Sequence, residues 1–163
     1  MKIWGVTGWK NAGKTSLVAR LVTEFSARGL TVSTVKHASH GFDLDQPGTD
    51  SFQHRKAGAR EVLISSGRRW ALMHENDGPE PTLAELLPRL SPANLVLVEG
   101  FKTAPHPKIE AHRAEAGHPL IAPGNATIRA IAADSDIDTG SLPRLPLNDT
   151  GAIADFIAAE LDL

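Results

Sequence analysis

The chain contains no cysteine, so its 163 residues form neither disulfide bonds nor thiolate metal sites, and no cysteine nucleophile is available. A net charge of −2 and a pI of about 6.4 provide no basic footprint for nucleic-acid binding. No apolar run approaches the ~18 residues of a membrane span, and the N-terminus does not resemble a signal peptide. We therefore expect a cytoplasmic protein without nucleic-acid or membrane partners, folded as a single domain over residues 1–163.

Near the N-terminus, the sequence GWKNAGKT fits the pattern G-x-x-x-x-G-K-[ST] of a phosphate-binding loop, or P-loop. Gly8 and Gly13 permit the tight turn that brings backbone N–H groups up to phosphate oxygens. Lys14 supplies a charge for the β- and γ-phosphates, and the Thr15 hydroxyl can ligate Mg²⁺. A strand-like run precedes the motif, and apolar residues at helical spacing follow it. The motif and its context predict a nucleotide site at the N-terminus of a helix.

Apolar and β-branched runs predict the strands of an α/β protein. The expected strands are residues 2–7, 30–35, 61–65, 69–74, 95–99, 108–112 and 128–133. The first two strands and the helix between them form a βαβ unit, which predicts a parallel sheet. The runs on either side of Ser66-Gly67-Arg68 predict an antiparallel hairpin. The expected fold is a three-layer α/β P-loop NTPase with a mostly parallel, doubly wound sheet and an inserted antiparallel hairpin.

Capping patterns predict further helices. Asp50 resembles the N-cap of a short helix. Thr82 and Glu85 have the spacing of a capping box. Asn148 or Asp149 is expected to cap an amphipathic C-terminal helix that covers the sheet.

The run Leu95-Val96-Leu97-Val98-Glu99 has the form of a Walker B element, in which an acid at the carboxyl end of a buried strand faces Mg²⁺ or its water. The backbone N–H of Gly100 follows directly and can sense a γ-phosphate. The alternative is a buried strand that ends in a turn, and the P-loop upstream favours the Walker B interpretation. We predict that Lys14 and Glu99 act on the triphosphate, with Thr15 and Glu99 at the metal.

The polar stretch after the second strand contains His37, His40, Asp43, Asp45 and Asp50. One hypothesis is a nucleotide-responsive switch loop whose carboxylates hold Mg²⁺. The other is a solvated loop with local turn and capping duties. A further alternative is a metal-delivery GTPase that binds its metal through His37 and His40.

The guanine-reading motif Asn-Lys-x-Asp is absent, although Asp134 follows a predicted strand and can accept hydrogen bonds from a guanine edge. No glutamine stands beside the Walker B strand, and no arginine finger is evident, which predicts slow hydrolysis. A small metabolite kinase is the rival enzyme hypothesis. It requires arginines over the phosphates, for which Arg68, Arg69 and Arg113 are candidates.

Five stretches in consistent order resemble the family of molybdopterin-guanine dinucleotide biosynthesis protein B (MobB). They are GWKNAGKTS, TVKHASHGFDLDQPGTDS, RKAGA (55–59), LVLVEGFK (95–102) and PKIE (107–110). The resemblance implies a GTP-binding protein of the SIMIBI branch with Mg²⁺, a homodimer whose sheets join, and at most weak GTPase activity. It implies an adaptor beside the molybdenum cofactor guanylyltransferase and molybdoenzyme maturation factors, and not the transferase itself. Molybdopterin is a further candidate ligand.

The resemblance also implies roles for individual residues. The phosphate loop maps onto Gly8, Asn11, Ala12, Gly13, Lys14, Thr15 and Ser16, and the metal and γ-phosphate side onto Asp45, Glu99 and Gly100. His37 and Asp134 complete the predicted nucleotide-binding set, while His40, Asp50, Ser51, Lys102, Lys108 and Glu110 match family motifs without an assigned role. One position departs from the pattern. Many relatives carry a lysine directly after the first glycine, where this chain has Trp9, followed by Lys10.

Overall fold

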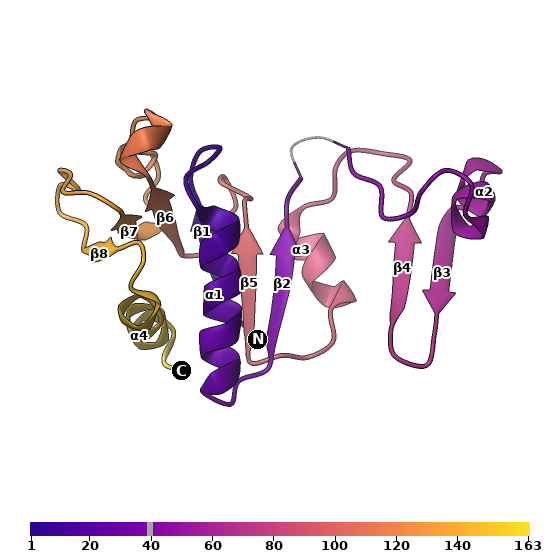
Figure 1. Ribbon diagram of the computed structural model, residues 1–163, viewed down its shortest axis with the longest axis horizontal. Coiled ribbons are helices and arrows are strands. Elements are labelled where there is room, and N and C mark those ends of the chain that lie inside the picture. Colours follow the sequence, from indigo (N-terminus) through magenta and orange to yellow (C-terminus); the bar gives the residue numbers. More distant parts are fainter. Residues whose placement is uncertain (39–40) are drawn as a thin grey trace. The chain divides into compact units, whose positions relative to one another are not determined.

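The structure is a computed structural model that describes residues 1–38 and 41–163 (Figure 1). These residues form two compact units. Unit 1 comprises Met1–His37 and Leu87–Leu163, and unit 2 comprises Ala38–Leu86. That residues 1–163 form a single domain stays a prediction. None of the helices that the structure describes has the length and apolarity needed to cross a membrane.

Unit 1 contains a six-stranded sheet in which every pairing is parallel. Its strands, in spatial order, are β2 (Val32–Lys36), β5 (Leu95–Glu99), β1 (Lys2–Thr7), β6 (Lys108–His112), β7 (Ile128–Ala133) and β8 (Arg144–Pro146). From β1 the chain passes to β2 at one edge and returns to β5, and it then continues from β6 to β8 on the other side of β1, so the direction of winding changes at β1. Ligands of such sheets bind beyond the carboxyl ends of the strands at this switch point, which is where the P-loop follows β1. The predicted parallel α/β sheet is confirmed.

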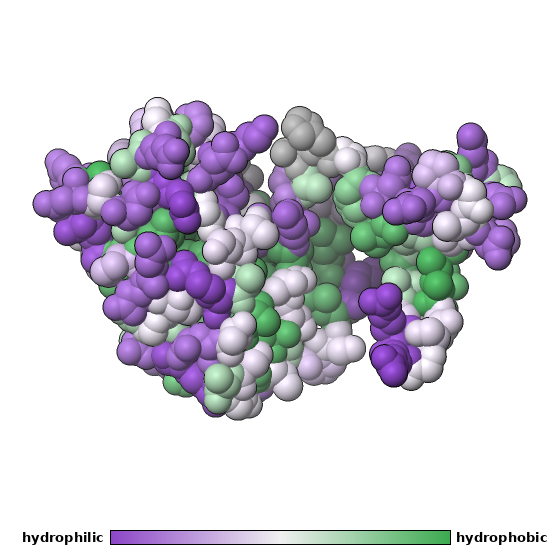
Figure 2. Space-filling model, viewed as in Figure 1, coloured by the Kyte–Doolittle hydropathy of each residue, from purple (hydrophilic) through white to green (hydrophobic). Residues whose placement is uncertain are grey.

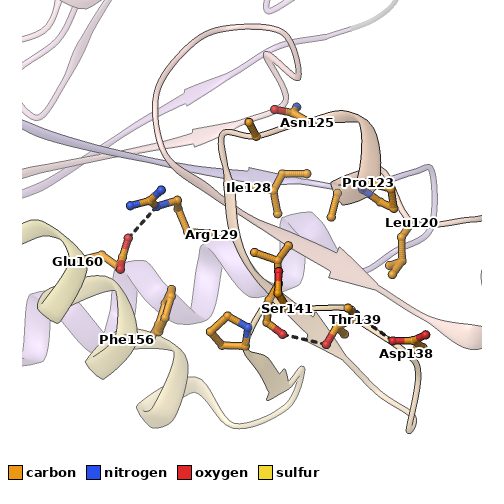
Figure 3. A pocket seen from close by; sticks show the side chains of 15 residues that line it. Leu120, Pro123, Asn125, Ile128, Arg129, Asp138, Thr139, Ser141, Phe156 and Glu160 are labelled. Atoms are coloured by element: carbon orange, nitrogen blue, oxygen red, sulfur yellow. Dashed lines mark hydrogen bonds and ion pairs between the residues drawn. The ribbon is translucent and has the colours of Figure 1, made fainter.

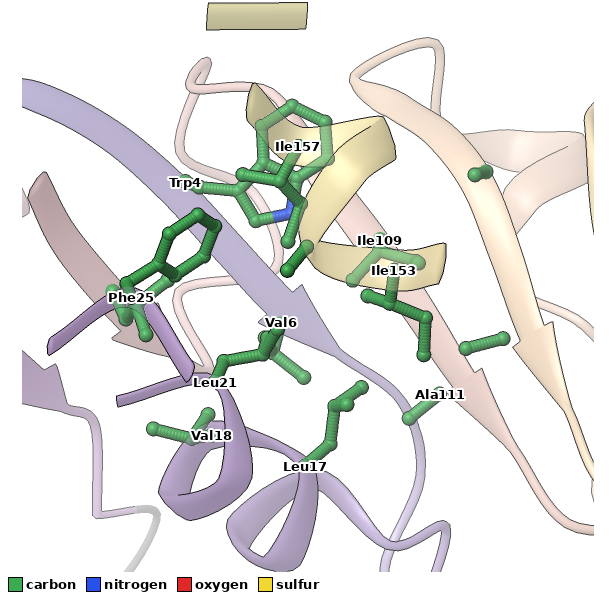
Figure 4. Close-up of a cluster of buried hydrophobic side chains, with 14 of the residues drawn as sticks. Trp4, Val6, Leu17, Val18, Leu21, Phe25, Ile109, Ala111, Ile153 and Ile157 are labelled. Atoms are coloured by element: carbon green, nitrogen blue, oxygen red, sulfur yellow. The ribbon is translucent and has the colours of Figure 1, made fainter. Parts of the chain in front are cut away.

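The core of unit 1 lies between the sheet and two long helices, α1 (Lys14–Ala27) and α4 (Thr150–Leu161), as Figure 4 shows. Alternate residues of each strand face these helices, because side chains in a strand alternate between the two faces of the sheet. The buried cluster includes Trp4, Val6, Leu17, Leu21, Phe25, Leu95, Leu97, Ile109, Ala111, Ile153 and Ile157. Strand β5 is buried along its whole length, as expected for a central parallel strand.

Unit 2 contains α2 (Asp50–Lys56), the strands β3 (Glu61–Ser65) and β4 (Trp70–His74), and α3 (Leu83–Leu86). The two strands form the predicted hairpin, and the Ser66 N–H donates to the Arg69 carbonyl across its turn at 2.9 Å. The hairpin forms a two-stranded sheet of its own and is inserted in the chain between β2 and β5, so the predicted antiparallel insertion is confirmed. Leu63, Ile64, Trp70 and Leu72 are exposed, and hydrophobic surface is visible over the hairpin in Figure 2.

One helix cap and one strand differ from the sequence predictions. Thr49, and not Asp50, caps α2, because Thr49 has an extended backbone and its Oγ1 accepts from Phe52 N at 3.4 Å. Strand β8 was not predicted, since three residues ending in Pro146 carry no periodic signal. The capping box is confirmed, with Glu85 Oε2 accepting from Thr82 N at 2.8 Å, and of the two residues considered for α4 it is Asp149 that caps it.

Candidate nucleotide-binding site

The predicted P-loop connects the carboxyl end of β1 to the first turn of α1. Gly8 has φ 142° and Gly13 has φ 90°, and L side chains rarely adopt either conformation. A Cβ atom on Gly8 would lie 2.4 Å from the carbonyl oxygen of Ala111, so the close approach of the loop to β6 also requires glycine. Between them, Asn11 has φ 65°, a conformation that asparagine tolerates better than most residues. The glycines of the motif are therefore needed for the loop to form as it does.

A cavity of about 300 Å³ opens over the start of α1. It is lined by Asn11, Gly13, Lys14, Thr15, Ser16 and Arg113. The first five belong to the predicted phosphate-binding set, and the structure thus brings them around one cavity. The N-terminal turn of α1 presents unpaired backbone N–H groups, which suit an anion.

The Lys14 ammonium donates a hydrogen bond of 2.7 Å to the carbonyl oxygen of Trp9 within the P-loop. Burial lowers the pKa of Lys14, nearby Glu99 opposes this effect, and the positive charges of Lys102 and Lys36 lower the pKa further. A bound polyphosphate would counter both the burial and the repulsion, since an adjacent negative charge favours the ammonium form. The charge around Lys14 is therefore arranged to favour an anionic ligand.

Glu99 ends β5 beside the first turn of α1. Its Oε1 accepts a hydrogen bond of 2.8 Å from the Thr15 hydroxyl and lies 3.7 Å from the Lys36 ammonium. The carboxylate is almost buried, with a side-chain exposure of 10%. A hydroxyl and a carboxylate in contact are hard oxygen ligands of the kind that Mg²⁺ prefers.

The described residues contain no group of three or more histidine, aspartate or glutamate side chains able to hold a metal ion. Magnesium at nucleotide sites typically takes one or two protein ligands, with phosphates and water completing its octahedron. Thr15 and Glu99 fit that requirement. The same observation disfavours an all-protein zinc or nickel site within the described residues, whereas His40 lies outside them.

His37 and Gly100 meet at the carboxyl ends of β2 and β5. The His37 N–H donates to the Glu99 carbonyl at 2.9 Å, and a Cβ atom on Gly100 would lie 2.9 Å from the His37 Cβ. The Gly100 N–H donates to the Val6 carbonyl at 3.2 Å, so contact with a γ-phosphate would require this bond to open. The imidazole of His37 packs against the Phe101 ring with centroids 4.9 Å apart.

Asp134 follows β7 at the same edge of the sheet as the P-loop. Its Oδ1 accepts a hydrogen bond of 3.0 Å from the Ala114 N–H, which holds the loop after β6. The predicted contact of Asp134 with a guanine edge stays a prediction.

Asp45 belongs to unit 2, where Arg55 of α2 holds it. The Arg55 guanidinium donates to Asp45 Oδ1 and to Asp43 Oδ1, both at 2.8 Å, and the hydrogen bond to Asp45 is the main cause that raises the pKa of Arg55. The Asp45 side chain is only 3% exposed. Arg55 belongs to the RKAGA motif, but its pairing with Asp45 was not predicted from the sequence. The metal role of Asp45 stays a prediction.

Lys108 and Glu110, whose role the sequence left open, are completely buried on the face of the sheet opposite α1 and α4. The Lys108 ammonium donates to the carbonyls of Ala104 at 2.6 Å and His106 at 2.9 Å, and to Thr127 Oγ1 at 2.7 Å. The Glu110 carboxylate accepts from the N–H groups of Ile121 and Ala122, at 2.8 Å and 2.9 Å. Lys108 therefore anchors the segments that lead into β6 and β7, and Glu110 anchors the loop between these two strands.

A larger cavity, of about 680 Å³, lies at the opposite edge of the sheet (Figure 3). It is lined by residues of the segment 120–126 before β7, by the start of β7, by residues 138–143 and by the end of α4. Arg129 Nε donates there to Glu160 Oε2 at 3.0 Å. Because β1 and β7 point the same way in a parallel sheet, the amino end of β7 lies opposite the P-loop edge. No P-loop residue lines this cavity.

Comparison with known proteins identifies relatives over most of the chain. A family model described as molybdopterin guanine dinucleotide synthesis protein B (MobB) matches residues 3–134. The chain is 39% identical over 153 residues to the molybdopterin-guanine dinucleotide biosynthesis adapter protein of Escherichia coli, covering 91% of this chain and 87% of the relative. It is 36% identical over 156 residues to the protein of that name from Haemophilus influenzae, covering 94% and 85%.

Solved structures agree with this assignment. The crystal structure of Bacillus subtilis MobB has a TM-score of 0.77 at 26% identity and covers 99% of this chain and 98% of that one. A MobB homolog from Bacillus stearothermophilus has a TM-score of 0.73 at 26% identity, with 99% of both chains covered. The resemblance seen in the sequence motifs is confirmed by the family model, the relatives and the fold. This chain belongs to the MobB family of molybdopterin guanine dinucleotide synthesis proteins.

Proposed function

We propose that this chain is an adapter protein in molybdopterin-guanine dinucleotide biosynthesis that binds GTP with Mg²⁺ at its P-loop. The biosynthetic role comes from the relatives in Escherichia coli and Haemophilus influenzae, which carry the name of biosynthesis adapter proteins. The observation that supports nucleotide binding best is the cavity in which Lys14, Thr15 and the first turn of α1 surround a space suited to phosphates.

The side chains have distinct tasks in this proposal. Lys14 leaves the Trp9 carbonyl, 2.7 Å away, and binds phosphate oxygens instead. Thr15 and Glu99 hold Mg²⁺, which also bridges phosphates, after their mutual hydrogen bond opens. Each exchange replaces a hydrogen bond within the protein by a bond to the ligand or the metal. The polar side chains of the site therefore have partners both before and after the nucleotide binds.

Hydrolysis at this site is slow in the proposal. The residues after Glu99 are Gly100, Phe101 and Lys102, and none of them is a glutamine that would orient water. A protein of this kind works below the roughly 1–100 s⁻¹ typical of kinases and serves as a nucleotide-dependent partner instead.

The exposed hairpin supports a homodimer. Two strands alone form a marginal sheet with unpaired edges, and such edges pair readily with another chain. Leu63 and Leu72 are directly opposite each other in the register and are 62% and 44% exposed. We further propose a cytoplasmic location and contact with the guanylyltransferase and with molybdoenzyme maturation factors.

Titration of the purified protein with GTP, ATP and molybdopterin in the presence of Mg²⁺ tests the proposal. GTP binding in the wild type and its loss in Lys14→Ala are the expected result. If neither nucleotide changes the melting temperature or gives calorimetric heat, the proposal is wrong.

The same preparation tests the rival hypotheses. Free phosphate as the sole product favours the adapter, whereas a phosphorylated acceptor favours the metabolite kinase. Specific Ni²⁺ or Zn²⁺ binding that disappears in His37→Ala would favour metal delivery.

A further inference from the structure

Arg113 directly follows β6 and lies over the P-loop. A Cβ atom built on Gly13 would be 2.9 Å from Arg113 Nε and 3.5 Å from Arg113 Nη2. The guanidinium occupies this position because residue 13 has no side chain. Arg113 thus forms one wall of the cavity whose other walls are P-loop and α1 residues.

The guanidinium of Arg113 has no protein partner among the described residues. Four other arginines of unit 1 are engaged: Arg20 donates to the Leu147 carbonyl, Arg28 pairs with Glu24 and Asp155, Arg129 pairs with Glu160, and Arg144 pairs with Asp136. Arg89, the remaining one, is exposed to solvent and outside the cavity. Arg113 Nε is buried and has no acceptor within the part of the chain that the structure describes. A buried donor without an acceptor is costly, so such a group in a cavity indicates a ligand that supplies one.

The loop that carries Arg113 is fixed at several points. The Ala114 N–H donates to Asp134 Oδ1 at 3.0 Å, and the buried Glu110 holds Ile121 and Ala122. The Trp9 indole donates to the Pro119 carbonyl at 2.8 Å, which ties this loop to the P-loop itself. The backbone that carries Arg113 is therefore held in place before any ligand binds, which lowers the conformational entropy lost on binding.

We propose that Arg113 is a phosphate-binding residue of this site, supplied by the same chain, and that it contacts the polyphosphate tail of the nucleotide together with Lys14. The inference rests on the proposed nucleotide binding and adds a residue that lies far from the P-loop in the sequence. Two cations and the amides of one helix turn suit a diphosphate or triphosphate better than a monophosphate. The planar guanidinium matches two phosphate oxygens at once, which an ammonium cannot do.

The test measures calorimetric affinity for GTP with Mg²⁺ and for inorganic tripolyphosphate, which has no base or sugar. Arg113→Gln should weaken both by about 10- to 100-fold, the range for loss of a charge-assisted hydrogen bond pair. Arg113→Lys should recover part of the lost affinity, because lysine keeps the positive charge but lacks the planar guanidinium that binds two oxygens at once. Arg89→Gln is the matched control, since it removes the same charge from an exposed residue outside the cavity and should bind as the wild type does.

The outcomes separate this inference from the proposed function. If Lys14→Ala loses GTP while Arg113→Gln binds GTP and tripolyphosphate like the wild type, the inference is wrong and nucleotide binding stands. If the wild type binds neither ligand, both are wrong. If Arg113→Gln melts at a lower temperature without ligand, Arg113→Lys decides: a lysine variant that melts normally and still binds both ligands as tightly as the wild type overturns the inference.

Discussion

The Thr15 hydroxyl donates a hydrogen bond of 2.8 Å to Glu99 Oε1 and so joins the first turn of α1 to the end of β5. The two residues are 84 positions apart in the sequence. Their side chains meet because β1 and β5 are neighbouring parallel strands whose carboxyl ends lie at one edge of the sheet. This pairing places a hydroxyl and a carboxylate where a metal bound to phosphates would need them.

We expect substitutions at this pair to weaken the effect of Mg²⁺ on GTP binding. Thr15→Ala and Glu99→Gln should each lose most of the affinity gained from Mg²⁺, while Thr15→Ser should keep it because the hydroxyl remains. Calorimetric titrations with GTP, with and without Mg²⁺, measure the difference. An unchanged Mg²⁺ effect in both Thr15→Ala and Glu99→Gln would show that the metal binds elsewhere.

Trp9 should report nucleotide binding by fluorescence. Its carbonyl accepts the Lys14 hydrogen bond, its ring lies 4.2 Å from the Lys102 ammonium, and its indole donates to Pro119. If Lys14 moves to a phosphate, the surroundings of this ring change. Addition of GTP with Mg²⁺ should alter the emission of the wild type, and Trp9→Phe should bind GTP without the spectral change. The same change in Trp9→Phe would assign the signal to Trp4 or Trp70.

His106 should make the protein less stable in mild acid. Burial, assisted by the nearby Lys108 charge, lowers the pKa of His106 to about 4 from the usual 6.5. Because the unfolded chain takes up the proton first, this contribution to stability is complete above pH 6.5 and is lost as the pH falls towards 4. About 2 kcal/mol should be lost by pH 5.

Urea unfolding at pH 7.5 and pH 5 measures this dependence. Neither ring nitrogen of His106 has a hydrogen-bond partner among the described residues, so His106→Leu should flatten the pH dependence without leaving a new unpaired group. The control His54→Leu changes an exposed histidine of α2 and should keep the wild-type slope. An equally steep slope in His106→Leu would assign the acid sensitivity to other groups.

Removal of the Glu110 carboxylate should destabilise the fold. Glu110→Ala leaves the N–H groups of Ile121 and Ala122 without their acceptor, and we expect a loss of about 2–4 kcal/mol in the free energy of unfolding. Glu110→Gln should lose less because an amide oxygen still accepts. The control Glu115→Ala changes an exposed carboxylate and should be nearly neutral. Equal stability of the alanine variants at the two positions would contradict the anchoring role.

The hairpin should control the oligomeric state. Replacing the opposed pair Leu63 and Leu72 by glutamate puts like charges on its exposed surface, and we expect the proposed dimer to dissociate. Sedimentation or light scattering gives the mass in solution. Gln53→Glu adds a charge to an exposed position of α2 and should leave the mass unchanged. A dimer that survives both leucine substitutions would place the interface elsewhere.

Local features of the sequence were sufficient for much of this fold. The P-loop, the Walker B strand and the hairpin were predicted because their signals lie within a few neighbouring residues: glycines that permit a tight turn, a buried run that ends in an acid, and two strands around a short turn. The sequence motifs also sufficed to identify the MobB family. Thr49 was missed as a cap because Asp50, the next residue, is an equally good capping type, and only the backbone conformation distinguishes the two.

Tertiary structure alone decided which distant groups meet. Strand β6 and the loop after it place Lys108 and Glu110 against the loops that they anchor, and Arg113 beside Gly13. Helix α2 places Arg55 where it pairs with Asp45. Hydrogen bonds between residues far apart in the chain follow from the order and register of the strands, and a sequence pattern read locally contains neither. The sequence determined the chemistry of the phosphate loop, and the packing of parallel strands determined which side chains surround it.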